Sequence, residues 1–261
     1  KHRVPVVNLP KVGKPWGAEI RGALIAKKGK IFLGSDMVSL ESTTKRHYMY
    51  PHDPDYVEEM SHPDFDEHLD LAIHAGRATK EEVLKHVRGE ISLKSVRDPF
   101  KTVNYSAIYG VGVPKLAREG GFTRAEASTL LTTYWERNWS VKVIAKEQYV
   151  KTLKDGSMWL KNPVSGFYHS LRFEKDIFST LNQSTGVYCF DTWLAYCAAA
   201  GVEIPMQYHD EILAECDDDE QSIKDTKERM QNAITKTNEK VKLNVQLSID
   251  VQIGYNYAQV H

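Results

Sequence analysis

The stretch VEIPMQYHDEILA, residues 202–214, predicts a strand, a tight turn and a second strand. Apolar residues lie on both sides of a polar centre. His209, Asp210 and Glu211 fall at or near the turn. We therefore expect an antiparallel hairpin here, with chemically active side chains close to its tip.

Other segments add strands to this hairpin. IFLGSDM, residues 31–37, is a short apolar run ending in a carboxylate, which is typical of a buried strand. Residues 243–251 alternate apolar and polar side chains and predict a final strand. The turn sequence KDGS, residues 154–157, separates two more strand-like runs.

Helical patterns fill most of the remaining chain. Asp98 is a good N-cap and Pro99 suits the first helical position, so we expect a helix over residues 98–110 that leaves Arg97 just outside it. Strands and helices are segregated along the chain, which favours an α+β fold over a doubly wound sheet. Two further helices are predicted to begin at Thr79 and Thr123, each with a capping box. Two more are predicted over residues 176–200 and about 220–240.

The composition is that of a folded protein of moderate size. Of 261 residues, 41% are hydrophobic and 26% charged, and 34 Lys and Arg against 35 Asp and Glu give a formal net charge of −1. This balance excludes a simple basic nucleic-acid coat but allows local basic patches. Three cysteines without Cys-x-x-Cys spacing argue against a zinc cage or a disulfide framework. No apolar run reaches 18 residues and no signal peptide is evident, so we expect a cytoplasmic protein.

The carboxylates of Asp36 and Asp210 are the first candidates for chemistry. Each has an ordinary alternative: Asp36 as an exposed strand end or helix cap, and Asp210 with Glu211 as solvated turn residues. Paired carboxylates from distant segments are also what a two-magnesium site needs, because hard divalent cations take oxygen ligands. Two such ions about 3.5–4 Å apart can stabilise the attacking and leaving oxygens of an in-line displacement.

Arg97, Lys101, Tyr105 and Tyr109 follow one another at intervals of four residues. On a helix this spacing places them in a slowly drifting stripe along one face. Two cations followed by two aromatic hydroxyls suit a triphosphate followed by a sugar and base. The ordinary alternative is a basic surface followed by core tyrosines.

Together these segments resemble the three motifs of the family A DNA polymerases, the bacterial Pol I and bacteriophage replicative group. DMVSLE, residues 36–41, resembles motif A. The stripe from Arg97 to Tyr109, with Asn104 and Gly110, resembles motif B, and QYHDE, residues 207–211, resembles motif C.

Further segments extend this resemblance over essentially the whole chain. QSTG, residues 183–186, resembles the Gln-containing helix between motifs B and C. Gly254-Tyr255-Asn256-Tyr257 through His261 resembles the family's C-terminal ending, and Asn8-Leu9-Pro10 with Ile20-Arg21 resembles the segment before motif A.

The resemblance implies template-directed DNA synthesis, in which dNMP is transferred from a dNTP to a primer 3′-OH. It implies two Mg²⁺ held by Asp36, Asp210 and the backbone carbonyl of Met37. The other implied roles are catalysis for Glu211 and Lys101, dNTP binding for Arg97, Lys101, Tyr105, Tyr109, Glu41 and His68, and DNA binding for Gln183, His209 and Arg21.

Two of these residues imply a particular substrate preference. Glu41 corresponds to the steric gate, which packs where a ribose 2′-OH would sit and so favours deoxynucleotides. Tyr105 corresponds to a position that is Phe or Tyr in the family. Its hydroxyl can replace the hydrogen bond of a missing 3′-OH, so we expect sensitivity to dideoxynucleotides.

The resemblance also implies a domain organisation. Residues 1–45 and 165–261 correspond to the palm, an antiparallel sheet with helices, and residues 46–164 to the helical fingers. The family's thumb and exonuclease-type region would precede residue 1, so we expect a split or truncated polymerase whose partner polypeptide carries them. The predicted partners are therefore primer–template DNA, dNTPs and that second chain, with no membrane.

Three other classes of protein stay open at this point. One is a metal-dependent nuclease, which could use the carboxylates but would not need the stripe from Lys101 to Tyr109. A single-subunit bacteriophage-type RNA polymerase shares several motif residues, but Glu41 and the Glu after His209-Asp210 favour DNA synthesis. An inactive polymerase-like subunit would only bind nucleic acid or a partner. It would have no need of Asp36, Lys101 and Asp210 together.

Overall fold

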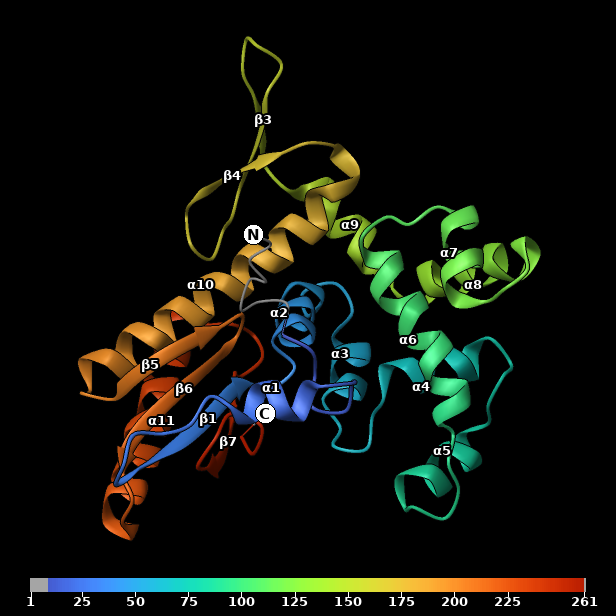
Figure 1. Ribbon diagram of the computed structural model, residues 1–261. Coiled ribbons are helices and arrows are strands. Elements are labelled where there is room, and N and C mark those ends of the chain that lie inside the picture. Colours follow the sequence, from blue (N-terminus) through green and yellow to red (C-terminus); the bar gives the residue numbers. More distant parts are fainter. Residues whose placement is uncertain (1–8, 261) are drawn as a thin grey trace, which may run out of the picture. The chain divides into compact units, whose positions relative to one another are not determined.

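A computed structural model describes residues 9–260 (Figure 1). These residues form two compact units. Unit 1 is formed by the described residues up to Thr44 and from Thr185 onward, and unit 2 is Lys45–Ser184. The division falls inside two helices, α2 (Leu40–Met49) and α10 (Ile177–Ala199). Residues 165–184, expected with the palm, thus belong to unit 2. Asn8 and His261 lie outside the described residues.

Unit 1 is built on a four-stranded antiparallel sheet with the strand order β5-β6-β1-β7. The predicted hairpin is confirmed as β5 and β6, and the IFLGSDM strand as β1. The elements of unit 1, besides its parts of α2 and α10, are α1 (Gly17–Gly22), β1 (Lys30–Met37), β5 (Glu203–Tyr208), β6 (Glu211–Asp217), α11 (Glu220–Val241) and β7 (Ile249–Gly254).

The C-terminal segment packs onto one face of this sheet. Tyr257 and Val260 are buried there with Phe32 of β1 and Leu213 of β6. Gly34 faces the same segment, and a Cβ there would lie 2.4 Å from the Val260 carbonyl oxygen. The glycine in the middle of an otherwise apolar strand is therefore required by this close backbone approach.

The last strand starts later than its sequence pattern predicts. β7 begins at Ile249, whereas alternation predicted a strand from residue 243. The intervening segment is held by a side chain of α11, because the Asn238 amide donates to the Leu247 carbonyl and accepts from the Leu247 N–H. These bonds take the place of a strand ladder, so Leu243 and Leu247 are buried without strand pairing.

Unit 2 is largely helical. Its core gathers buried residues of α4, α6, α7 and α8, among them Phe100, Leu116 and Tyr134. The capping boxes predicted at Thr79 and Thr123 are confirmed at the starts of α5 and α8. The helices that lie wholly in unit 2 are α3 (Pro54–Met60), α4 (Glu67–His74), α5 (Lys80–Val87), α6 (Lys94–Ile108), α7 (Val113–Gly120), α8 (Arg124–Arg137) and α9 (Trp139–Glu147).

Helix α6 starts earlier than predicted. Its first residue is Lys94, so Arg97 lies within the first turn and Pro99 lies inside the helix. The predicted N-cap at Asp98 is therefore wrong. Pro99 removes one backbone N–H from the helix ladder but its fixed φ is compatible with helix, and Phe100 and Val103 anchor the same helix in the core. Burial of the apolar face thus outweighs the local stop signal.

Unit 2 also contains a small antiparallel sheet, coloured yellow in Figure 1, with the order β2-β3-β4. Its strands are β2 (Val150–Thr152), β3 (Met158–Lys161) and β4 (Tyr168–Leu171). The turn predicted at 154–157 is confirmed, while β4 adds a third strand that the pattern did not indicate. The α+β class is confirmed. No helix within residues 9–260 is long and apolar enough to cross a bilayer.

Candidate active site

One end of the four-stranded sheet carries a row of acidic residues. Asp36 of β1 is paired with Glu211 of β6 on one side and with Asp250 of β7 on the other. Directly paired residues of antiparallel strands project from the same face, so three carboxylates share one row, which we call the acidic row. Glu211 is buried, whereas Asp36 and Asp250 are exposed. Neighbouring carboxylates disfavour one another's ionisation, and a cation bound near them would relieve that repulsion.

The hairpin turn brings Asp210 to the same end of the sheet. Tyr208 and Glu211 are paired, so His209 and Asp210 form the two-residue tip. The Met37 N–H donates to the Asp210 carbonyl at 3.2 Å, which ties the end of β1 to this tip. The predicted metal-binding carboxylates Asp36 and Asp210 therefore lie on adjacent segments, although they are far apart in sequence.

His209 holds an unusual backbone conformation. Its φ of 52° lies in the left-handed region, which non-glycine residues adopt at a cost of about 1–2 kcal/mol. Its exposed ring packs edge-on against Tyr208, with 4.8 Å between centroids. A positive φ at the first central residue is what the common two-residue hairpin turns require, so the turn itself accounts for this conformation.

Glu211 is held by a hydrogen bond from the C-terminal segment. The buried Tyr257 hydroxyl donates to a Glu211 carboxylate oxygen at 3.1 Å. Burial and the neighbouring Glu211 carboxylate raise the pKa of Tyr257 well above its usual range, so this hydroxyl stays protonated and donating. The predicted C-terminal motif thus contributes directly to the acidic end of the sheet.

Arg21 completes this buried layer. Its guanidinium lies 4.7 Å from the Tyr257 ring centroid, and its Nε donates to the Pro10 carbonyl at 2.8 Å. Only 1% of the residue is exposed. The DNA contact implied for Arg21 stays a prediction, and this arrangement favours a role in holding Tyr257.

The oxygen donors at this end suit Mg²⁺. Asp36, Asp210 and the Met37 carbonyl are hard ligands, and Mg²⁺ in nucleotide enzymes takes one or two carboxylates together with water and substrate phosphates. Within residues 9–260, no three His, Cys, Asp or Glu side chains gather as a ready-made metal cage. These donors therefore suit a Mg²⁺ site whose remaining ligands come from water and substrate phosphates.

In unit 2, Arg97 is already engaged by a carboxylate. Its Nε donates to Asp66 at 2.5 Å. Asp66 is also the N-cap of α4, accepting from the backbone N–H groups of His68 and Leu69. Burial opposes ionisation of Asp66, but the Arg97 guanidinium and the Leu69 N–H hold its pKa below the usual range. A phosphate that binds Arg97 must share it with Asp66 or displace that residue.

Lys101 and Tyr105 lie along α6 as the stripe predicted. Both are exposed, and the Lys101 ammonium lies 5.8 Å from the Tyr105 ring centroid. The centroid of the His68 ring lies 5.6 Å from that of Tyr105, and its Nδ1 lies 3.0 Å from the Asn104 amide. Burial lowers the pKa of His68, so its imidazole is neutral near pH 7 and any phosphate contact would be a neutral hydrogen bond.

Tyr109 and Gln183 are brought together at the end of α6. The Gln183 amide donates to the Tyr109 hydroxyl at 2.7 Å, and both side chains are exposed. Gly110 follows with a φ of 66°, confirming the predicted helix stop. Glu41, the predicted steric gate, lies in the first turn of α2 and is partly exposed.

Sequence reasoning missed two of the residues now at these sites. Asp250 joins the acidic row only through the register of β1 with β7. Asp66 reaches Arg97 across 31 positions of sequence. The pattern of an Asp before the helix that contains His68 could have revealed the N-cap, but not its ion pair with Arg97.

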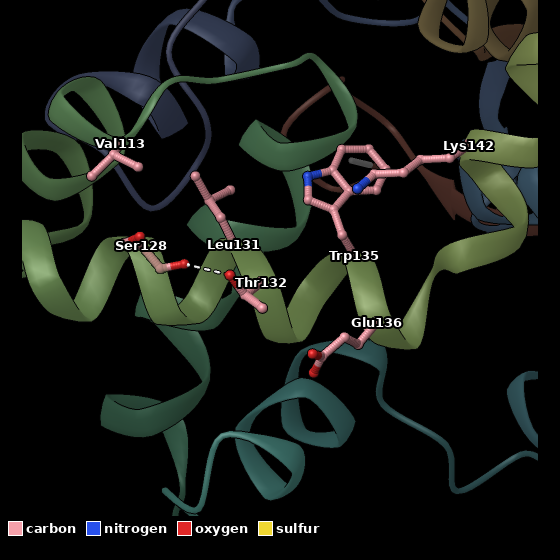
Figure 2. Close-up of a pocket in the computed structure, with 7 residues that line it drawn as sticks. All are labelled: Val113, Ser128, Leu131, Thr132, Trp135, Glu136 and Lys142. Atoms are coloured by element: carbon pink, nitrogen blue, oxygen red, sulfur yellow. Dashed lines mark hydrogen bonds between the residues drawn. The ribbon is translucent and has the colours of Figure 1, made fainter.

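A separate hollow of about 440 Å³ lies in unit 2, around Trp135 (Figure 2). Lys142 extends over the indole, with its ammonium 4.7 Å from the ring centroid. The Thr132 hydroxyl is bonded to the Ser128 carbonyl on the adjoining helix face. The hollow is lined by Val113, Ser128, Leu131, Thr132, Trp135, Glu136 and Lys142 and includes none of the predicted nucleotide-binding residues.

Comparison with protein families identifies this chain. The family model described as DNA polymerase family A matches residues 3–166. The match covers more than half of the chain, and the chain therefore belongs to DNA polymerase family A.

Individual relatives agree with this family. The chain is 24% identical to the thermostable DNA polymerase I of Thermus filiformis, over 97% of this chain and 30% of that protein. It is 29% identical to DNA polymerase I of Helicobacter pylori, over 59% of this chain and 16% of that protein. The chain thus spans less than a third of the length of these curated relatives.

A solved structure shows the same fold. The POL domain of Pol1 from M. smegmatis, in complex with DNA primer-template and dNTP, matches with a TM-score of 0.75. Sequence identity is 18%, and the match covers 97% of this chain and 44% of that one. The fold of a polymerase domain therefore extends over nearly all of the present chain.

Proposed function

We propose that this chain catalyses template-directed DNA synthesis, joining dNMP from a dNTP to a primer 3′-OH. The observation that carries this proposal is the meeting of Asp36 and Asp210 at one end of the sheet in a family A chain. Residues 1–45 and 165–261 would serve as the palm and residues 46–164 as the fingers.

The acidic end of the sheet would hold two Mg²⁺ through Asp36, Asp210 and the Met37 carbonyl. When bound, the ions would stabilise negative charge on the attacking and leaving oxygens. Tyr257 fixes Glu211 behind these ligands by a hydrogen bond. The exposed ring of His209, held at the turn by its backbone, would face the primer terminus.

The α6 stripe would bind the incoming nucleotide. Lys101 offers an exposed ammonium for the triphosphate. Arg97 would join it by exchanging Asp66 for a phosphate oxygen, because the two anions compete for one guanidinium. Tyr105 and Tyr109 would lie by the sugar and the nascent base pair.

Glu41 and Gln183 would read the substrate and the DNA. Glu41 would exclude ribonucleotides as a steric gate, and Gln183, held by Tyr109, would contact DNA. The separate polypeptide expected to carry a thumb and an exonuclease region stays a prediction.

Primer extension tests the proposal directly. The assay uses this chain with Mg²⁺ and a short primer–template, with dNTPs and NTPs in parallel reactions. Asp210→Asn should abolish extension. Asp217→Asn is the matched control, because Asp217 is the last residue of β6, at the end away from the hairpin tip, and is bonded to Lys30.

We expect extension by dNTPs, strong preference over NTPs and early termination when ddNTPs are added. Equal extension by wild type and Asp210→Asn would contradict the proposal. Equal use of NTPs would contradict the steric-gate role of Glu41, and insensitivity to ddNTPs would contradict the role of Tyr105.

A further inference from the structure

The three-stranded sheet of unit 2 has one face made of aromatic and lysine side chains. Lys161 of β3 is paired with Tyr168 of β4, and its N–H donates to the Tyr149 carbonyl on the other side. One step along, Trp159 lies between Lys151 and Ser170. Paired residues share a face, so two rows that each combine rings with a lysine lie side by side. This aromatic–lysine face comprises Tyr149, Lys151, Trp159, Lys161 and Tyr168.

This face is open to solvent, unlike the opposite face of the same sheet. Tyr149 is 59% exposed and Tyr168 46%. Leu160 and Leu171, which point the other way, are 0% and 5% exposed. The apolar face explains how the sheet is held in place, whereas packing within the chain does not explain the exposed rings.

The charge around these rings is positive. Residues 149–173 contain four basic side chains, three Lys and Arg172, against the single carboxylate of Asp155. That carboxylate is already used within its turn, where it accepts from the Ser157 N–H and hydroxyl. The segment therefore departs from the balanced charge of the whole chain. Lys151 and Lys161 occupy strand positions paired with Trp159 and Tyr168.

A hollow opens beside the first row. It has a volume of about 600 Å³ and is lined in part by Tyr149, Lys161 and Pro163. Glu147 also lines it, and its carboxylate lies 3.0 Å from the His52 imidazole. The hollow thus combines a ring with a cation, the pair of groups that binds a nucleobase and its phosphate.

The base of this surface is fixed. The Asn162 amide, at the start of the β3–β4 connection, donates to the Ser184 hydroxyl at 2.8 Å. Its carbonyl accepts from the N–H groups of Val164 and Ser165. The turn beside Lys161 is therefore preorganised, and little ordering is needed when a ligand binds.

We propose that the aromatic–lysine face binds unpaired DNA, with bases stacked on its rings and phosphates beside its lysines. Stacking surfaces with interspersed cations recognise single strands without reading sequence, because every base has a π-face. The biological ligand, on the proposed polymerase function, is the unpaired part of the template. The binding itself requires no catalysis.

The test is binding by the full chain, followed by fluorescence anisotropy. The probes are fluorescein-labelled oligo(dT) and a blunt duplex of the same length. Tyr149→Ala combined with Tyr168→Ala should weaken oligo(dT) binding at least tenfold, since loss of one stacking ring alone has about that effect. Affinity for the duplex should change less than twofold.

Conservative and remote variants test whether loss of the aromatic rings is the reason for weaker oligo(dT) binding. Tyr149→Phe combined with Tyr168→Phe keeps both rings and should bind oligo(dT) as wild type does. Tyr50→Ala is the matched control, because Tyr50 is 47% exposed but lies just after α2. Lys151→Ala with Lys161→Ala should reduce the salt dependence of binding, by about 0.7 in slope for each phosphate that is no longer neutralised.

Unchanged oligo(dT) affinity in the double Tyr→Ala variant would overturn the proposal. An equal loss for duplex and single strand would also overturn it. So would binding of the wild-type chain to phosphatidylserine vesicles in place of oligo(dT). Failure of primer extension with oligo(dT) binding intact would count against the polymerase function alone, so the two proposals can be separated.

Discussion

The two units of this chain gather their candidate residues in different ways. In unit 1 the backbone brings the candidate residues together, because β1 lies between β6 and β7 and the strand register places Asp36 between two other acidic residues. In unit 2 side-chain hydrogen bonds position the candidate residues: Arg97 donates to Asp66, and Gln183 donates to Tyr109.

This difference has a consequence for substitutions. A residue placed by strand register can lose its functional group while the strand keeps its position. A residue placed by a side-chain contact also supports its partner, so its removal affects function and stability together. The following predictions test this contrast in order of expected effect.

The largest effect is expected from Asp36→Asn. Activity in primer extension should fall about 10²–10³-fold or more, the loss usual when a group that stabilises transition-state charge is removed. Stability should be unchanged or slightly higher, because Asp36 is exposed and lies between two like charges. Urea unfolding and steady-state extension measure the two quantities.

A marked loss of stability in Asp36→Asn would show that the carboxylate supports the fold. It would remove the contrast between the units. Glu228→Gln, which neutralises an exposed carboxylate on α11, serves as a control for both assays.

A second prediction probes the side-chain support that Tyr257 gives to the acidic end. Tyr257→Phe removes the hydroxyl that donates to the buried Glu211. Loss of a hydrogen bond to a buried acceptor costs about 1–3 kcal/mol, so the midpoint of urea unfolding should fall accordingly. Tyr255→Phe, which alters an exposed side chain two residues earlier, should change stability by less than about 0.5 kcal/mol.

A third prediction separates the two roles of Asp66. Asp66→Ala removes both the helix cap and the partner of Arg97 and should destabilise the protein by about 1–2 kcal/mol. Asn also caps helices well, so Asp66→Asn should lose only the ion pair and be destabilised less. If Arg97 binds the triphosphate, Asp66→Asn should also lower the KM for dNTPs a few-fold. An unchanged or higher KM would contradict that role.

The sequence predicted local features well and long-range pairings poorly. Thr79 and Thr123 start their helices as expected, because a capping box is formed by residues three apart. The tip at His209 and Asp210 was also predicted, since a tight turn between two apolar runs is local.

The failures have tertiary causes. Pro99 lies inside α6 because core packing of that helix outweighs the hydrogen bond that proline cannot make. Leu243 and Leu247 alternate as in a strand, yet the side chain of Asn238, in the last turn of the preceding helix α11, binds the backbone of Leu247 in place of a strand partner. Asp250 entered the acidic row through strand register, which no pattern within residues 243–251 could reveal.

The smallest effect expected is a pH dependence that arises in unit 2. Burial lowers the pKa of His68 below 6.5, while Glu67 and Asp66 oppose this shift and Arg97 and Lys101 add to it. The unfolded chain therefore binds a proton more readily than the folded one, and stability falls as the pH drops from about 6.5 through the folded-state pKa.

His68→Gln should flatten this dependence, because a neutral amide does not titrate. Unfolding by urea at pH 7.0 and at pH 5.5 measures it, and the difference between the two pH values should be smaller in the variant than in wild type. Glu215 of unit 1 behaves differently. Burial opposes its ionisation, but the hydrogen bonds from the Lys27 N–H and ammonium lower its pKa. Its contribution to the free energy of unfolding is therefore lost only below about pH 4.5. If the stability of His68→Gln changes with pH as much as that of wild type, the buried imidazole is not the source of the pH dependence. The side-chain contacts around α6 would then add no stability change between pH 7.0 and pH 5.5.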